Sequence, residues 1–235
     1  MRKIFGIIKP MEKISTPKHI AIICDGNRRW AKERNLPSFE GHKKGFENIK
    51  KLSKKGKELG VSIMTFWVFS TENWKRAVDE VGYLMKLAED VIEVQMKEAI
   101  EEETRIVHIG RKDRIPDGLR KKIENAEEKT KQFSKYYFVI ALDYGGHDEI
   151  ERAVKKMDGS QTEQIDNYLD TKILPYPNPD LIIRPGGEER LSGFMTWQAA
   201  YSEYYFSDLY FPEFGPEALV ESIKEFSERK RRFGK

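Results

Sequence analysis

Side chains suited to phosphate chemistry follow a short apolar run near the start of the chain. The segment Asp25–Trp30 (DGNRRW) combines a carboxylate, a glycine, an amide and two guanidinium groups directly after His19–Cys24. Glycine lets the backbone approach a ligand closely, and a helix that begins here would attract anions at its first amide groups. Asp25 would repel a phosphate unless a cation lay between them, so the pattern suggests Mg²⁺. The alternative role of Asp25 is to cap the helix.

Three further polar segments follow apolar runs later in the chain. Ser70–Arg76 (STENWKR) offers hydroxyl, amide and guanidinium groups, although Ser70 or Thr71 could serve only as a helix cap. Asp143–His147 contains a Gly-Gly turn, which by itself is a weak signal. Arg184–Ser192 carries two arginines around another Gly-Gly turn. Arginine forks suit a diphosphate, at ~1.5–3 kcal/mol per charged hydrogen bond. An ordinary polar loop is the alternative interpretation.

Several phosphate-binding classes are excluded by missing motifs. The chain has no Gly-x-x-x-x-Gly-Lys-[Ser/Thr] segment, so it is not a P-loop nucleotide hydrolase. It has no Gly-x-Gly-x-x-Gly segment, so a dinucleotide site lacks support. It also has no Asp-Asp pair, which argues against the diphosphate sites that are built on aspartate-rich motifs.

Short apolar runs alternate with long amphipathic segments, and this alternation predicts the fold. Strands are predicted at His19–Cys24, Ser62–Phe69, Arg105–Ile109, Tyr137–Leu142, Leu181–Ile183 and Tyr204–Phe206. Helices are predicted at Gly41–Leu59, Asp79–Glu102, Pro116–Phe133, Gly146–Met157 and Pro216–Phe233. The pattern indicates an α/β single domain with a mostly parallel six-stranded sheet flanked by helices on both faces.

Ligands of such sheets bind beyond the carboxyl ends of the strands. The four polar segments come directly after predicted strands, so we expect them to share one edge of the sheet. The guanidinium groups predicted to converge at this edge are those of Arg29, Arg76, Arg184 and Arg190.

Composition limits the classes of partner. The 235 residues suit one domain, and 42 Lys+Arg against 39 Asp+Glu give a net charge of +3, which does not indicate a nucleic-acid partner. One cysteine excludes a disulfide framework and favours a reducing, cytoplasmic location. No apolar run is long enough to span a bilayer. Residues 1–17 are expected to form an arm with a basic start, and a weak contact with a membrane surface is its alternative role.

The four polar segments, in this order, resemble those of the cis-prenyltransferases, above all undecaprenyl and related polycis-polyprenyl diphosphate synthases. The matching segments are His19–Lys32, Glu40–His42, Phe69–Arg76, Asp143–Gly146, Leu181–Phe194, Trp197-Gln198 and Arg231–Gly234. The resemblance covers residues 18–235, which we interpret as the catalytic domain. It implies a homodimer that adds isopentenyl diphosphate repeatedly to an allylic primer, farnesyl or geranylgeranyl diphosphate, with Mg²⁺ and no redox cofactor.

The resemblance also assigns roles to residues. Asp25 is the central catalytic carboxylate and acts on Mg²⁺, and Asn73 belongs to the loop that carries proton removal and diphosphate departure. Glu203 matches a second carboxylate that assists Mg²⁺, with the neighbouring subunit as one source. Arg184, Arg190 and Ser192 match the isopentenyl diphosphate site. The other residues assigned to substrate binding are Gly26, Asn27, Arg28, Arg29, Trp30, His42, Ser70, Thr71, Glu72, Trp74, Arg76, Arg232 and Gly234.

Two positions depart from the family pattern. Ser38 stands where an arginine is usual, so we expect weaker primer binding unless Arg28 or Arg34 substitutes. Pro185 stands where threonine or serine is common. These departures keep a second hypothesis open, a short-chain or non-elongating relative that prenylates another acceptor. An accessory subunit is a further alternative, and the presence of Asp25 argues against it.

Overall fold

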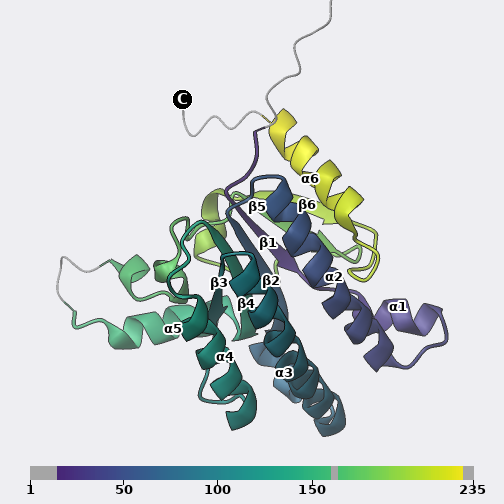
Figure 1. The fold of residues 1–235 in the computed structure, drawn as a ribbon, viewed down its shortest axis with the longest axis horizontal. Helices are drawn as coiled ribbons and strands as arrows, with labels where there is room; N and C mark the ends of the chain where they lie inside the picture. The colour runs from purple at the N-terminus through teal and green to yellow at the C-terminus, as the bar shows by residue number, and fades with distance from the viewer. Residues whose placement is uncertain (1–14, 160–163, 230–235) are drawn as a thin grey trace, which may run out of the picture.

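The computed structural model describes residues 15–159 and 164–229, and within them six parallel strands form one sheet (Figure 1). The strands are β1 (His19–Ile23), β2 (Ile63–Ser70), β3 (Thr104–Ile109), β4 (Tyr136–Tyr144), β5 (Leu181–Pro185) and β6 (Glu203–Ser207). Their order in the sheet is β3-β4-β2-β1-β5-β6, and every neighbouring pair is parallel. The predicted six-stranded α/β domain is confirmed, with a sheet that is entirely parallel in the described residues.

In the described part of the chain, six α-helices connect or follow the strands. They are α1 (Asn27–Glu33), α2 (Ser38–Glu58), α3 (Val78–Glu101), α4 (Asp117–Thr130), α5 (Gly146–Lys156) and α6 (Pro216–Glu228). Four short 3-10 helices are η1 (Thr71–Lys75), η2 (Ile165–Asn167), η3 (Asp170–Ile173) and η4 (Gln198–Tyr201). The last predicted helix ends at Glu228 rather than Phe233, whose position lies outside the described residues.

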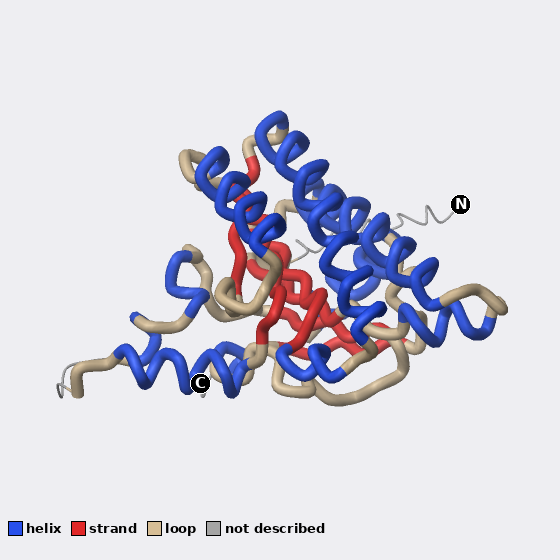
Figure 2. The backbone as a smooth tube through the Cα atoms, turned by 90° about the horizontal axis from the view of Figure 1, so that it is seen from below, coloured by secondary structure: helices blue, strands red, loops and turns tan. Residues whose placement is uncertain are grey.

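Apolar side chains leave the two faces of the sheet in alternation and form two cores. Ile20 and Ile22 lie in the core beneath α2, α3, α4 and α6, whereas Ala21 lies in the opposite core, with Phe194 and Met195. Helix α5 belongs to this second face, because its Glu149 accepts a hydrogen bond from the Tyr144 hydroxyl at 2.6 Å. Helices therefore cover both faces, as predicted, but the layers are unequal (Figure 2).

Strand β1 is the centre of the architecture. All five of its residues are buried, and it pairs with β2 on one side and β5 on the other. A strand buried on both faces needs an apolar run without alternation, and His19-Ile-Ala-Ile-Ile23 has that character. The chain proceeds from β1 to β2 and later returns to place β5 on the other flank, so the carboxyl end of β1 lies where the strand order reverses. Such a reversal is the usual ligand position in open α/β sheets.

No helix among the residues that the structure describes is long and apolar enough to cross a membrane.

Three buried histidines make the fold sensitive to acid. Burial is the main reason why the pKa values of His19, His42 and His108 are lowered to about 4. The rings of His19 and His108 are hydrogen-bonded inside the protein, His19 to Thr65 Oγ1 at 2.7 Å and His108 to the Leu142 carbonyl at 3.0 Å. The folded state therefore holds these rings neutral.

We predict that the free energy of unfolding falls as the pH drops. A lowered folded-state pKa gives stability that is complete above about pH 6.5 and is lost toward pH 4. At pH 5 each of these histidines should cost about 2 kcal/mol relative to pH 7.5. Urea unfolding at both pH values measures this loss. His19→Gln should flatten the pH dependence and exposed His147→Gln should not. Equal stability at the two pH values would contradict the prediction.

Candidate active site

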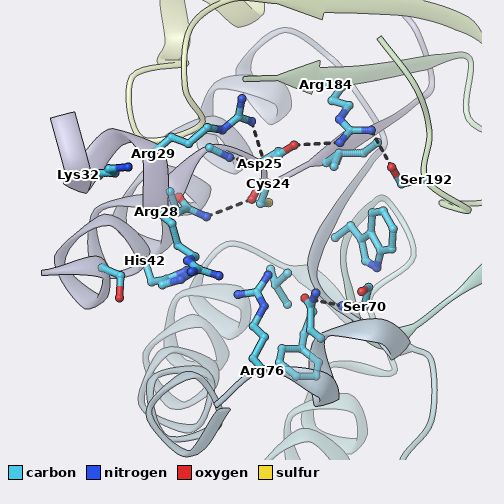
Figure 3. Close-up of a pocket in the computed structure, with 18 of the residues that line it drawn as sticks. Cys24, Asp25, Arg28, Arg29, Lys32, His42, Ser70, Arg76, Arg184 and Ser192 are labelled. Atoms are coloured by element: carbon cyan, nitrogen blue, oxygen red, sulfur yellow. Dashed lines mark hydrogen bonds and ion pairs between the residues drawn. The ribbon is translucent and has the colours of Figure 1, made fainter. Parts of the chain in front are cut away.

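A pocket of about 840 Å³ opens where β1, β2 and β5 end (Figure 3). The predicted site residues that line it are Asp25, Gly26, Asn27, Arg28, Arg29, His42, Ser70, Asn73, Arg76, Arg184 and Ser192. Cys24, Lys32 and Ser38 line it as well, and Trp67 and Val68 give its floor an apolar part. The structure thus brings together residues from three of the four polar segments at one edge of the sheet.

The turn after β1 is shaped by a glycine. Gly26 has φ +93° and stands at the N-terminal cap position of α1, where no side chain makes a capping hydrogen bond. A Cβ atom at Gly26 would lie 2.6 Å from Tyr210 Cδ1, so a larger residue would not fit. Asn27 Nδ2 donates to the Cys24 carbonyl at 3.0 Å and closes the turn. Asp25 is therefore not a helix cap, and its carboxylate is left for the pocket.

Asp25 joins two arginines on one side of the pocket. Its Oδ2 accepts a hydrogen bond from Arg184 Nη2 at 2.9 Å, and its Oδ1 lies 3.3 Å from Arg29 Nη2. The other terminal nitrogen of Arg184 donates to Ser192 Oγ at 3.0 Å. Arg29 also lies over the Tyr210 ring, 5.4 Å from its centroid. These contacts hold two guanidinium groups beside a single carboxylate (Figure 3).

Glu80 organises the opposite side of the pocket. Its Oε1 accepts a hydrogen bond from Arg76 Nη1 at 3.1 Å and lies 3.8 Å from both Arg28 Nη1 and His42 Nε2. Glu80 is not among the site residues predicted from the sequence. The local signal for it is weak, because Arg76 precedes α3 in extended conformation and the four-residue spacing to Glu80 does not lie within one helix. The contacts with Arg28 and His42 depend on the tertiary fold.

His42 is buried and faces this cluster as a neutral ring. Burial, together with the nearby charge of Arg76, lowers its pKa to about 4. Near neutral pH the ring therefore contributes hydrogen bonds rather than charge to the pocket. Its Nε2 has no hydrogen-bond partner within the described part of the chain.

The polar segment after β2 forms the short helix η1. Asn73 Oδ1 accepts a hydrogen bond from the Ser70 backbone N–H at 3.0 Å, and the Ser70 side chain receives the reciprocal bond. The capping role considered for Ser70 is thus correct, but Asn73 is fixed rather than solvated. Both residues still line the pocket.

The structure places several predicted residues elsewhere. The Arg190 side chain is exposed and does not line the pocket, but Glu188 pairs with both Arg190 and Arg29, so Arg190 lies at the same edge of the sheet. Thr71 and Glu72 line a neighbouring groove of about 500 Å³, which Ser192 also lines. Two other predicted residues, Trp30 and Trp74, do not line the main pocket.

The C-terminal candidates and Glu203 do not meet Asp25 in the described chain. Glu203 starts β6, pairs in register with Leu181 and accepts a hydrogen bond from Arg229 at 3.0 Å. It therefore lies at the amino edge of the sheet, opposite to Asp25, because Leu181 in turn pairs with Ile20 near the start of β1. Asp25 and Glu203 of the same chain therefore cannot hold one metal ion, and a site that takes the two carboxylates from two subunits stays a prediction. Arg232 and Gly234 lie outside the described residues.

Arg28 and Arg34 were the two residues expected to take the place of the arginine that is usual at position 38, and the structure distinguishes between them. Arg34 forms an ion pair with Glu213, and its guanidinium lies over the Trp30 ring at 4.8 Å from the centroid. It does not line the pocket. Arg28 does line the pocket, as Ser38 does, and remains the candidate.

A buried donor without a partner indicates that the pocket binds an anion. Arg184 is 5% exposed, yet its Nε has no hydrogen-bond partner in the described chain. Leaving such a group unpaired costs about 1–3 kcal/mol or more. A ligand that accepts a hydrogen bond from Arg184 Nε therefore gains binding free energy. An oxygen-rich anion bound near Asp25, with guanidinium groups on both sides, fits this arrangement.

The donor set also fits one divalent cation that arrives with a phosphate. No group of three or more acidic, histidine or cysteine side chains that could hold a metal occurs among residues 15–159 and 164–229. Mg²⁺ often takes only one or two carboxylates and completes its shell with water and substrate phosphates. Asp25 is the acidic residue that lines the pocket and can serve in this way.

Comparisons with known proteins agree on one family. The sequence profile of the undecaprenyl diphosphate synthase family matches residues 23–234. A ditrans,polycis-undecaprenyl-diphosphate synthase of Micrococcus luteus is 42% identical, over 93% of this chain and 91% of its own. A (2Z,6Z)-farnesyl diphosphate synthase of Solanum lycopersicum is 44% identical, over 97% and 82%. The crystal structure of lavandulyl diphosphate synthase from Lavandula x intermedia with dimethylallyl diphosphate has a TM-score of 0.90 and 34% identity, over 94% and 99%.

We predict that Gly41→Ala disturbs the pocket through the contact between α1 and α2. A Cβ atom at Gly41 would lie 2.0 Å from the Asn27 carbonyl oxygen, so α1 must move. We expect a loss of about 1–3 kcal/mol in the free energy of unfolding and weaker binding of inorganic pyrophosphate, measured by urea unfolding and calorimetry. The matched control is Gly82→Ala in α3, whose Cβ meets nothing within 4 Å and should add about 0.5–1 kcal/mol. Unchanged pyrophosphate affinity in Gly41→Ala would contradict the prediction.

Proposed function

Because the chain belongs to the undecaprenyl diphosphate synthase family of cis-prenyltransferases, we propose specific substrates and residue roles for its prenyl transfer. The enzyme is a transferase that makes a polyprenyl diphosphate. Isopentenyl diphosphate adds repeatedly to a short allylic primer, farnesyl or geranylgeranyl diphosphate. The observation that carries this proposal is the Asp25–Arg184 ion pair in a pocket with four arginines on its walls.

Each cycle breaks one bond to oxygen and forms one bond between carbons. The bond from the allylic carbon to its diphosphate breaks, and the electron pair leaves with diphosphate. The terminal alkene carbon, C4, of isopentenyl diphosphate bonds to the allylic carbon. Its C2 then loses a proton as the new Z double bond forms between C2 and C3. Two diphosphates must lie side by side for this step, and their repulsion requires strong local positive charge.

The pocket supplies that charge from two sides. The primer diphosphate lies at the turn Asp25–Arg29, where backbone amides and two guanidinium groups face it and His42 offers a neutral ring. Isopentenyl diphosphate lies against Arg184 and Ser192, and the unpaired Nε of Arg184 donates to it. Fixed donors aimed at the leaving oxygens stabilise the transition state more than the ground state.

Mg²⁺, bound through Asp25 and the primer phosphates, would supply charge neutralisation for the departing diphosphate. Asn73 and Ser70 lie on the pocket wall formed by the end of β2 and η1. There Asn73 positions the group that accepts the proton lost by isopentenyl diphosphate. Arg76 adds a guanidinium to the same wall. A role in catalysis for the segment Ser70–Arg76 is therefore supported by the place of Ser70, Asn73 and Arg76 on the pocket wall.

A short product is the second candidate, and one observation favours it. The apolar space behind the pocket, lined by Phe46, Phe66, Val91 and Phe138 among others, has a free volume of only about 20 Å³. That is room for about one water molecule. A long chain would require α3, which forms one wall of this space, to move away from β2 and β4.

The product of either candidate is apolar, and this suggests that the enzyme works at a membrane surface.

The functional unit that we propose is a homodimer. Large apolar side chains remain exposed around β6 and η4, and Tyr201 is 79% exposed and Trp197 43% exposed. Exposed aromatic side chains grouped in this way mark an interaction surface. Pairing through this surface would also give Glu203 a route to the Asp25 of the neighbouring subunit, which the single chain does not provide.

The direct test of the proposed function is product analysis. Purified protein with Mg²⁺, labelled isopentenyl diphosphate and farnesyl diphosphate should give a ladder of lipids in five-carbon steps, sized by mass spectrometry. Asp25→Ala should lower turnover at least about 100-fold, because it removes an electrostatic partner of the transition state. A single short product would establish the second candidate, and no product with bound primer would overturn both.

Ser38→Arg should strengthen primer binding. Ser38 lines the pocket beside His42 and Arg28, and an added guanidinium there can make about 1.5–3 kcal/mol of charged hydrogen bonds. We expect the apparent KM for farnesyl diphosphate to fall about tenfold, measured at saturating isopentenyl diphosphate. Ser38→Gln serves as the uncharged control of similar size. An unchanged KM in Ser38→Arg would show that Arg28 already fills the role.

A further inference from the structure

A buried carboxylate outside the pocket holds the segment that carries Asn73. Asp143, near the end of β4, is fully buried. Its Oδ1 accepts a hydrogen bond from Trp74 Nε1 at 2.8 Å, and its Oδ2 accepts one from Arg114 Nε at 2.8 Å. A second guanidinium nitrogen of Arg114 bonds to Oδ1, so the pairing is bidentate. Trp74 thus links the pocket wall to a buried ion pair on the neighbouring strand.

The backbone at Asp143 is distorted in a way that serves this contact. In the pairing of β2 with β4, Phe69 aligns with Leu142 and Ser70 aligns with Tyr144, so Asp143 is the extra residue of a bulge. Its φ is +51°, a left-handed conformation that is unfavourable for a residue with a Cβ atom. Bulges of this kind redirect side chains and are frequent beside active sites.

The burial of this carboxylate needs an explanation. A buried charge is retained only where it is paired and fully hydrogen-bonded, and removal of one partner is strongly destabilising. Stability alone would be served by an apolar pair of similar volume. The bulge and the left-handed backbone at Asp143 direct its buried carboxylate toward one side chain of the segment Ser70–Arg76. That side chain is Trp74.

The contact fixes the middle of the segment. Its start is held by the reciprocal hydrogen bonds of Ser70 and Asn73, and its end by the bond from Arg76 to Glu80. Between these points Trp74 packs edge-on against Phe69, with ring centroids 5.2 Å apart, and its indole N–H reaches Asp143. Rotation of η1 about its two ends would move Asn73, and the Trp74 bond opposes that rotation.

We propose that Asp143 is a positioning residue for prenyl transfer, which acts through Trp74 and is itself held by Arg114. It touches neither substrate, and its effect is to keep Asn73 and Arg76 at the pocket wall during diphosphate departure and proton removal. This inference rests on the proposed role of Ser70–Arg76 in the transfer step. It also gives Trp74, which the sequence analysis assigned to substrate binding, a different role.

Steady-state kinetics with farnesyl and isopentenyl diphosphate test the inference. Asp143→Ala should lower kcat by about 30-fold or more and change each KM less than about threefold, because small misplacement of a catalytic group slows the reaction strongly. Trp74→Phe keeps a ring beside Phe69 but loses the N–H, and it should lower kcat about tenfold. The double variant should be no slower than Asp143→Ala, since both changes remove the same bond.

Two further variants separate positioning from stability. Asp143→Asn retains an oxygen that accepts the Trp74 N–H, so it should recover most of kcat while melting at a lower temperature. Glu149→Gln is the matched control, because Glu149 is a buried carboxylate whose hydrogen bonds go to Tyr144, Gln198 and the Asp170 backbone rather than to Trp74 or Arg114. It should melt earlier and keep kcat within about twofold.

Amide hydrogen exchange gives a readout that does not depend on turnover. Residues 70–76 should exchange at least about tenfold faster in Asp143→Ala and Trp74→Phe, and at the wild-type rate in Glu149→Gln. Wild-type kcat in Trp74→Phe, additive losses in the double variant, or unchanged exchange of this segment would each overturn the inference. A wild-type protein without turnover would instead overturn the proposed function, and the exchange data would still decide whether Asp143 holds the segment.

Discussion

The buried guanidinium of Arg184 beside Asp25 is the contact on which the site depends. Arg184 lies at the end of β5 and is 5% exposed, so its charge needs a partner inside the protein. Asp25 provides that partner from the end of β1, across the junction of two parallel strands. The carboxylate thereby sets the position of Arg184 and, through a second contact, that of Arg29. Its own repulsion of phosphates is offset by the cations that it gathers.

The same arrangement recurs on the opposite wall with a different carboxylate. Glu80 contacts Arg28, His42 and Arg76, which come from α1, α2 and the end of η1. Two acidic side chains thus hold the positive side chains of the pocket in place before any substrate arrives. Preorganised charge of this kind costs little rearrangement when diphosphate leaves, which is what electrostatic catalysis requires.

The strands and the main pocket could be predicted from sequence because their signals are local. Buried parallel strands need unbroken apolar runs, and the polar groups that follow such runs must meet at one edge of the sheet. Arg190 does not line the pocket, because its guanidinium pairs with Glu188, two residues away, which also contacts Arg29. Glu80 was missed since two of its partners come from other helices. The bulge at Asp143 depends on how β2 and β4 align, and no residue pattern within either strand reports that register.

The strand order also governs when the site can form during synthesis. Asp25 and Arg184 are 159 positions apart in the chain, and the β5 flank of β1 has no strand to pair with until that second segment has been made. At ~5–20 residues per second, the interval is on the order of ten seconds. Throughout it, a central apolar strand presents one open hydrogen-bonding edge, a known route to aggregation. The geometry that joins two distant segments into one anion site therefore makes the nascent chain depend on protection of β1 until β5 arrives.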